Sequence, residues 1–251
     1  MRKEYLIAGN WKMFKTVAES REFVQDLARE FTAVPGLEVA VFPPFTALAA
    51  THGLDPKIKI GAQNMFFEEK GAFTGEISPL MLQELADCVL VGHSERREIF
   101  NESDADVNKK LKAALKFNLP PVLCIGETLP EREAGETLPK IKRQLERALK
   151  DVAGADIAKI TVAYEPIWAI GTGRNATPGQ AQEVHHFIRQ TLREMAPGNS
   201  SKILYGGSVK PENCLELLSQ EDISGVLVGG ASLKVDQFSA IIQIGLKLLR
   251  A

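Results

Sequence analysis

Cysteine is scarce in this chain: there are three in 251 residues, and they stand far apart. Cys88, Cys124 and Cys214 match no metal-ligand spacing, and an odd number does not suit a disulfide framework. Neither a disulfide-stabilised secreted scaffold nor a zinc-binding domain is therefore expected. We interpret the three as buried free thiols in a reducing compartment, which predicts a cytoplasmic protein.

Long apolar runs and an excess of charge of one sign are also missing. No run approaches the roughly 18 apolar residues of a membrane span, and the first residues lead into a strand-like segment rather than a signal-peptide core. The 30 Lys and Arg residues nearly balance the 32 Asp and Glu residues, for a net charge of −2. We therefore expect a soluble protein without a nucleic-acid or membrane partner, in which an anionic substrate needs local positive groups.

What the chain does have is a regular alternation of strand-like and helix-like segments. Hydrophobic residues make up 45% of it, which is enough for a large core. Apolar residues recur at helical spacing in segments 23–31, 138–152, 184–192 and 235–249, and Thr177, Pro178 and Gln180 form a capping signal ahead of the third segment. Nearly continuous apolar runs predict parallel strands, covered on both faces, at 5–10, 37–42, 58–63, 88–92, 121–126, 160–165, 202–207 and 225–229.

These strand–helix repeats, with no linker or low-complexity tract between them, predict an α/β protein made of a single (β/α)8 barrel domain over residues 1–251. An open doubly wound sheet is the rival architecture. It usually carries a glycine-rich dinucleotide turn after its first strand. Here residues 9–12 read Gly-Asn-Trp-Lys and lack the G-x-G-x-x-G pattern, so the barrel is favoured.

The segment 163–174 is the most informative part of the chain. A strand-like run ends there on Glu165, and Pro166 keeps that residue extended and stops the hydrogen-bond ladder. An apolar stretch with two glycines follows. A single carboxylate at a strand end, under a loop that could close over it, suits a general base beneath a lid. A structural ion pair beside an ordinary turn is the alternative.

Active sites of barrels lie where the strands end, so polar residues at strand ends are the candidates. Asn10 and Lys12 follow the first predicted strand, His93 follows the fourth, and Glu165 ends the sixth. Taken one at a time, Asn10 could cap a turn, Lys12 could be a surface charge, and His93 could be a buried structural histidine. Their common position at the same end of their strands favours one shared site.

Glycine turns after the seventh and eighth predicted strands indicate a phosphate site. Loops after these strands, with a short helix N-terminus, commonly bind phosphate in barrels. The backbone N–H groups of Gly229 and Gly230 could approach phosphate oxygens, Ser208 could donate its hydroxyl, and Gly171 could add an N–H when the lid closes. Plain turns are the alternative. This chemistry requires no metal, and no cluster of metal ligands is expected.

Taken together, six motifs make the chain resemble the triosephosphate isomerase family, whose fold is the TIM barrel, over essentially its whole length. One small departure is Phe14, where many members carry Asn, and no catalytic role is at stake there. The motifs are Gly9-Asn-Trp-Lys-Met13, Gly71-Ala-Phe-Thr-Gly-Glu-Ile-Ser78, Gly92-His-Ser-Glu-Arg-Arg97, Ala163-Tyr-Glu-Pro-Ile-Trp-Ala-Ile-Gly-Thr-Gly173, Tyr205-Gly-Gly-Ser-Val209 and Gly229-Gly-Ala-Ser-Leu233.

The resemblance implies an enzyme that interconverts dihydroxyacetone phosphate and D-glyceraldehyde 3-phosphate, a step of glycolysis and gluconeogenesis that needs no cofactor. Glu165 would move a proton between the two carbons through an enediolate. His93, kept neutral at a helix N-terminus, would donate a hydrogen bond to the substrate oxygen. Lys12 would supply positive charge and Asn10 a donor. By analogy with the family, Glu95 would hold Lys12 in place.

The resemblance also assigns roles to two loops. Closing residues 167–172 over the site would exclude water and protect the enediolate from losing phosphate. Trp168 is expected in the hinge of this lid, with simple core filling as the alternative. Residues 64–76 are long for a barrel loop. The family resemblance implies that this loop docks into a second subunit, with Thr74 approaching the partner's site, so we expect a homodimer.

Two other functions stay open at this point. Another phosphate-binding barrel enzyme could act on a larger sugar phosphate, although the compact rim loops favour a small substrate. A catalytically silent binding protein could keep the phosphate grip, but it would not need Lys12, His93 and Glu165 together. The remaining histidines and Cys124 are expected in surface or packing positions; these histidines are His52, His185 and His186.

Overall fold

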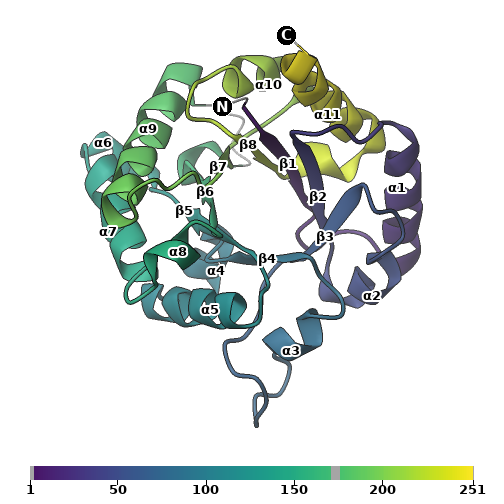
Figure 1. Cartoon of the computed structure of the whole chain (residues 1–251), viewed down its shortest axis with the longest axis horizontal. Coiled ribbons are helices and arrows are strands. Elements are labelled where there is room, and N and C mark those ends of the chain that lie inside the picture. The colour runs from purple at the N-terminus through teal and green to yellow at the C-terminus, as the bar shows by residue number, and fades with distance from the viewer. Residues whose placement is uncertain (1–2, 171–175, 251) are drawn as a thin grey trace.

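The computed structural model describes residues 3–170 and 176–250. Its centre is a closed sheet of eight parallel strands, in which each strand pairs with the next and β8 pairs with β1 (Figure 1). This confirms the predicted (β/α)8 barrel. The strands are β1 (Tyr5–Asn10), β2 (Leu37–Phe42), β3 (Ile58–Ala62), β4 (Cys88–Val91), β5 (Pro121–Ile125), β6 (Thr161–Tyr164), β7 (Ile203–Tyr205) and β8 (Gly225–Val228).

The first two strands have the predicted bounds, and the others are one to three residues shorter than predicted. The residues that drop out are at the strand ends, where Gln63, Gly92, Gly126 and Glu165 already belong to the loops of the rim. The polar and glycine residues there no longer follow the sheet ladder. The side chains of Gln63 and Glu165 are therefore available to a site, whereas the N–H groups of Gly126 and Glu165 are already paired.

Helices form an outer ring around the strands (Figure 1). They are α1 (Val17–Arg29), α2 (Leu48–Thr51), α3 (Pro79–Leu82), α4 (Ser94–Ile99), α5 (Asp104–Lys116), α6 (Leu129–Glu133), α7 (Thr137–Ala148), α8 (Gly154–Ile157), α9 (Pro178–Met195), α10 (Pro211–Leu218) and α11 (Val235–Arg250), with 3-10 turns η1 (Phe45–Ala47), η2 (Ile167–Ala169) and η3 (Gly230–Leu233). None of the helices in the described part of the chain is long and apolar enough to cross a membrane.

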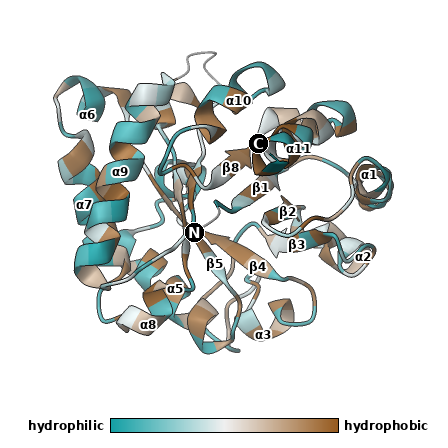
Figure 2. Ribbon diagram, turned by 45° about the horizontal axis from the view of Figure 1, so that its top comes forward, coloured by the Kyte–Doolittle hydropathy of each residue, from teal (hydrophilic) through white to brown (hydrophobic). Residues whose placement is uncertain are grey.

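The strands are apolar on both faces because each face is covered. On β1, Leu6 and Ala8 point into the barrel, whereas Ile7 belongs to the larger layer between strands and helices. Because both layers are buried, the strand sequences are unbroken apolar runs and do not alternate between apolar and polar residues. Figure 2 shows the strands mostly in the hydrophobic colour, while the helices carry both hydrophobic and hydrophilic residues around their circumference.

The four predicted apolar faces lie on α1, α7, α9 and α11. The predicted start of α9 is confirmed: Thr177 accepts a hydrogen bond from the N–H of Gln180 at 3.2 Å, and the Gln180 side chain accepts one from the Thr177 N–H at 3.0 Å. This reciprocal cap satisfies two N–H groups that the helix itself leaves unpaired. The helices are thus set against the barrel by both burial and local signals.

The three cysteines are buried, as expected. Cys124 lies on β5 inside the barrel, and burial raises the pKa of the Cys88 thiol to about 12. Neither group is a thiolate at neutral pH. No group of three or more His, Cys, Asp and Glu side chains that could hold a metal ion occurs among residues 3–170 and 176–250.

Candidate active site

A cavity of about 730 Å³ opens at the ends of the strands. The rim residues come from the loops after β1, β4, β6, β7 and β8, which meet because the carboxyl ends of parallel barrel strands share one side. Gly171 lies outside the described residues, and Thr74 lies on a distant exposed loop. The other candidate residues that line the cavity are Asn10, Lys12, His93, Glu165, Ser208, Gly229 and Gly230.

Glu165 is almost completely buried, at 1% exposure, and both of its carboxylate oxygens are engaged. Oε1 lies 3.0 Å from Nε2 of His93, and Oε2 accepts a hydrogen bond from the backbone N–H of Ser94 at 2.9 Å. Its own backbone N–H donates to the carbonyl of Ile125 at 2.7 Å, which extends the β5–β6 pairing by one residue. The carboxylate is thus held by two donors on the first turn after β4.

Gly126 makes room for this arrangement. A Cβ atom at that position would lie 1.7 Å from the backbone oxygen of Glu165, a distance at which the chain must move. Only glycine therefore lets the end of β5 approach the end of β6 this closely. The position of the candidate base depends on a residue without a side chain.

His93 caps α4, and its ring is nearly buried, at 7% exposure. The backbone N–H of Glu95 donates to its Nδ1 at 3.3 Å. An acceptor role for Nδ1 suits the tautomer with its proton on Nε2, the nitrogen that lies 3.0 Å from Oε1 of Glu165. This pattern agrees with the neutral, hydrogen-bond-donating imidazole expected from the sequence.

Lys12 adopts a left-handed backbone conformation, with φ of +54°. Its backbone N–H donates to the Asn10 side chain at 3.0 Å, and its carbonyl accepts from the Gln63 amide at 2.8 Å. The ammonium group lies 2.5 Å from the Glu95 carboxylate, the pair expected from the sequence. A lysine held in an unfavourable conformation by three partners has a set position, which is common at functional sites.

The glycine turn after β8 leaves open space in the cavity, whereas Gly206 after β7 packs closely against Glu165. A Cβ at Gly230 would meet nothing within 4 Å, and one at Gly229 would lie 3.7 Å from Cε of Lys12. The N–H groups that begin η3 therefore face the same space as the lysine side chain. Two further lysines at this side of the cavity, Lys210 and Lys234, add positive charge.

Glu127 was missed by the sequence analysis. It is fully buried, and its Oε1 accepts hydrogen bonds from the Tyr164 hydroxyl at 3.0 Å and from the Trp168 indole at 2.9 Å. Arg132 lies 3.3 Å from the same oxygen. Burial, followed by the charge of Glu127, raises the pKa of Tyr164. Trp168, expected in the hinge, is thereby anchored at the start of the proposed lid.

Both missed residues, Gln63 and Glu127, could have been found by the argument already used. Gln63 directly follows β3, and Glu127 stands two residues beyond β5. Applying the rule of polar residues at strand ends to all eight strands would have included them. They were passed over because neither belongs to a motif that suggested chemistry.

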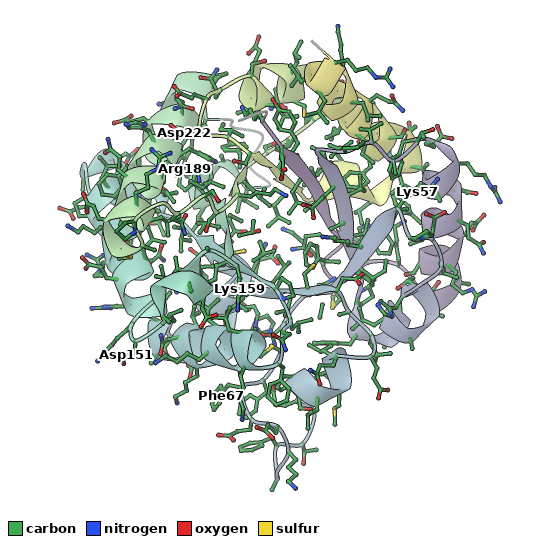
Figure 3. The ribbon with its side chains drawn as sticks, in the orientation of Figure 1. Lys57, Phe67, Asp151, Lys159, Arg189 and Asp222 are labelled. Atoms are coloured by element: carbon green, nitrogen blue, oxygen red, sulfur yellow. The ribbon has the colours of Figure 1, made fainter. Side chains whose placement is uncertain are left out.

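The remaining histidines have packing or surface positions, as expected. His185 is fully buried on α9, with Nδ1 2.7 Å from the Ala181 carbonyl, and burial lowers its pKa to about 4. His186, on the exposed side of the same helix, lies 3.0 Å from Asp222. Figure 3 labels Asp222 beside Arg189, and neither residue lines the cavity.

Comparison with known proteins agrees with this geometry. A family model described as triosephosphate isomerase matches residues 5–245. The chain is 51% identical to the triosephosphate isomerase of Carboxydothermus hydrogenoformans, over 97% of this chain and 99% of that protein. It is 52% identical to that of Moorella thermoacetica, over 94% and 97%. It is 51% identical to that of a Roseiflexus species, over 94% and 96%. The chain therefore belongs to the triosephosphate isomerase family.

Proposed function

We propose that this chain catalyses the reaction of its family, the interconversion of dihydroxyacetone phosphate and D-glyceraldehyde 3-phosphate in glycolysis and gluconeogenesis, and that Glu165, His93 and Lys12 carry it out. The supporting observation is that all three side chains line one cavity, together with the glycine turns of β7 and β8. A base, a hydrogen-bond donor and a cation can then act on one small phosphate ester.

The phosphate group would lie on the glycine turns. Backbone N–H groups of Gly229 and Gly230 and the hydroxyl of Ser208 would donate to its oxygens, and the start of η3 adds partial positive charge. Gly171, outside the described residues, would contribute another N–H from the lid. Lys12 would then lie between the phosphate and the reacting carbons, because its side chain passes beside Gly229.

Proton transfer requires one exchange of hydrogen-bond partners. In the structure the Nε2–H of His93 faces Oε1 of Glu165. A substrate carbonyl oxygen that takes this N–H leaves Oε1 free to remove the proton from the neighbouring carbon. Negative charge then develops on the oxygen that His93 and Lys12 face, and each such donor typically contributes about 10²–10³ in rate. His93 would then give its Nε2 proton to that oxygen and take up the proton of the neighbouring hydroxyl, so that a proton passes from one oxygen to the other. When Glu165 also returns the carbon-bound proton to the adjacent carbon, the isomerisation is complete and both residues have regained their starting protonation.

A coupled assay of the purified chain tests this proposal. Turnover of D-glyceraldehyde 3-phosphate without added metal or cofactor is the expected result. Turnover only with a larger sugar phosphate would point to another barrel enzyme. Phosphate binding without any turnover would point to a silent binding protein. Either outcome would refute the proposed reaction.

We further propose that the chain is a homodimer built through the loop 64–76. Ten large apolar side chains are exposed in the described part of the chain, and nine of them follow β1, β2, β3 or β4, on one half of the rim. They include Met13, which is 94% exposed, and Phe73, which is 44% exposed. The loop that holds Phe73 and Thr74 projects from the barrel beside α3, where Figure 3 labels Phe67.

Exposed apolar surface of this extent marks a protein interface. Sedimentation of the purified chain at micromolar concentration should give the mass of two subunits. Replacing Phe73 with aspartate should shift it toward the monomer, because a charge would be buried without a partner. A wild-type chain that sediments as a monomer would refute the proposal. We also propose a cytoplasmic location, since the buried thiols suit a reducing compartment.

A further inference from the structure

Lys15 connects two parts of the site that are far apart in the sequence. It stands between Lys12 and the start of α1, and its Nζ donates to the backbone carbonyl of Leu233 at 3.0 Å. The same ammonium group lies 4.5 Å from the centre of the Phe23 ring and 5.4 Å from that of Trp11. No role follows for this residue from the motifs of the sequence.

Both ends of this connection lead to the proposed phosphate site. Leu233 is the last residue of η3, the turn that begins with the open N–H groups of Gly229 and Gly230. The turn is closed on itself by Ser232, whose backbone N–H and hydroxyl donate to the Gly229 carbonyl at 2.8 and 2.7 Å. Fixing the carbonyl of Leu233 therefore fixes the whole turn.

The η3 turn also packs on β1, the strand that leads to Lys12. A Cβ at Gly9 would lie 2.8 Å from Cβ of Ser232, so the turn packs directly on β1 at that point. The hydrogen bond from Lys15 supplies a second point of attachment, on the loop that also carries Lys12.

The backbone at Lys15 supports a role for its side chain. Its φ is +74°, in the left-handed region that glycine and asparagine occupy more readily than lysine. The backbone alone thus gives no reason for lysine here. The ammonium group offsets this strain through a charge-assisted hydrogen bond and contacts with two aromatic rings. Burial lowers the pKa of Lys15, as expected for a cation partly removed from water.

We propose that Lys15 is a positioning residue for the phosphate site, holding the turn that carries Gly229 and Gly230 at a set distance from Lys12. This inference rests on the proposed function, because it takes the glycine turn to be the phosphate site. Lys15 does not line the cavity and acts only through the groups that it ties together.

Lys15→Met tests the proposal, because methionine keeps an unbranched stem and the same backbone preferences but removes the ammonium group. Lys57→Met is the matched control. Lys57 is also half-buried, and its ammonium group donates to the carbonyls of Ala28 and Phe31 and lies 5.4 Å from the Phe31 ring. Lys57, labelled in Figure 3, contacts the last turn of α1. It directly precedes the first residue of β3, and therefore lies on the opposite side of the barrel from the strand ends that form the cavity.

Lys15→Met should raise the KM for D-glyceraldehyde 3-phosphate and the Kd for inorganic phosphate by about threefold to tenfold, with kcat changed less than about twofold. Lys57→Met should lower the thermal midpoint about as much as Lys15→Met does, but it should leave KM and Kd unchanged. Lys15→Arg should restore both constants. If Lys15→Met does not fold, Lys15→Gln, a shorter neutral donor, takes its place, with the same expected rise in both constants.

Removing a positive charge near the cavity would itself weaken phosphate binding, even if the glycine turn did not move. The dependence of binding on salt separates this loss of charge from a displaced turn. Screening at 0.5 to 1 M salt, where the Debye length is about 3–4 Å, abolishes a distant field effect but not a misplaced turn. The ratio of mutant to wild-type Kd should therefore persist in high salt.

Three results would each overturn the inference. The ratio of mutant to wild-type Kd could fall to one in high salt. KM and Kd of Lys15→Met could equal those of the wild type, or they could rise equally in Lys57→Met. Calorimetry with inorganic phosphate distinguishes failure of the Lys15 proposal from failure of the proposed function. A wild type that binds no phosphate refutes the site itself. A wild type and Lys15→Met that bind it equally refute only the role of Lys15.

Discussion

Replacing Glu165 with glutamine, which has the same shape, tests the centre of the site. The carboxylate is buried and accepts two hydrogen bonds, from Nε2–H of His93 and the backbone N–H of Ser94. A carboxamide cannot take up a proton from carbon under these conditions. Since a positioned base typically contributes about 10²–10⁴ in rate, kcat should fall by that factor, or by about 3–5 kcal/mol of transition-state stabilisation.

The same change should also lower stability. A carboxamide has one acceptor oxygen, so one of the two donors must face its NH₂ group. Moving the His93 proton to Nδ1 would relieve this only at the cost of the hydrogen bond from the Glu95 N–H. A buried donor without a partner costs about 1–3 kcal/mol, which in a chain of this size lowers the thermal midpoint by several degrees.

The assay combines three measurements: kcat and KM for D-glyceraldehyde 3-phosphate, the Kd for inorganic phosphate, and the thermal midpoint. Phosphate binding should largely survive, because the proposed phosphate donors are Ser208, Gly229 and Gly230 and do not include Glu165. Glu165→Ala is the comparison, since water entering from the cavity can satisfy both donors; its kcat should fall equally and its midpoint less. A variant that turns over near the wild-type rate would refute the assignment of Glu165 as the base. A smaller loss of stability in Glu165→Gln than in Glu165→Ala would refute the argument from the two donors.

Three further predictions follow from the same contacts. Gly126→Ala should lower kcat by about 10²-fold or more, because its Cβ would displace the end of β6; Gly179→Ala, whose Cβ would meet nothing within 4 Å, should keep kcat and slightly raise the thermal midpoint. Lys12→Ala should raise KM and lower kcat together, since the ammonium group faces charge in both the bound substrate and the transition state; unchanged steady-state kinetics would remove this lysine from the mechanism. Burial lowers the folded-state pKa of His185 from 6.5 to about 4. Between pH 6.5 and pH 4 the unfolded chain therefore binds more protons than the folded chain. The stability that the neutral ring contributes is lost as the pH falls through this range, by about 3 kcal/mol in all. Chemical denaturation at pH 7.5 and pH 4.5 should show His185→Met losing less stability than wild type, and parallel losses would contradict the argument.

Much of the fold was predictable because it depends on local patterns. Continuous apolar runs of five or six residues, repeated between amphipathic segments, fit parallel strands covered on both faces. The capping box at Thr177 was predictable for the same reason, since its partners lie three residues apart. The convergence of Lys12, His93 and Glu165 followed from topology, because the ends of all strands in a closed parallel barrel meet on one side.

The sequence could not reveal how the site is held together. Gln63 reaches the carbonyl of Lys12 across 51 positions, and Lys15 reaches that of Leu233 across 218. Such contacts depend on strand register, left-handed backbone and side-chain rotamers, none of which produces a periodic signal. Glu127 was missed for the same reason: its role depends on the hydroxyl and indole groups that surround it in the folded chain.

The sequence by itself therefore determined the barrel and the residues that gather at its rim, because hydrophobic periodicity and strand direction are properties of short segments. Only the tertiary structure decided that both oxygens of Glu165 are occupied, that the Glu95 N–H donates to Nδ1 of His93, and that a lysine outside the cavity links its two sides. Those facts depend on distances of about 3 Å between atoms that chain folding alone brings together, and a hydrogen bond weakens steeply when such a distance changes.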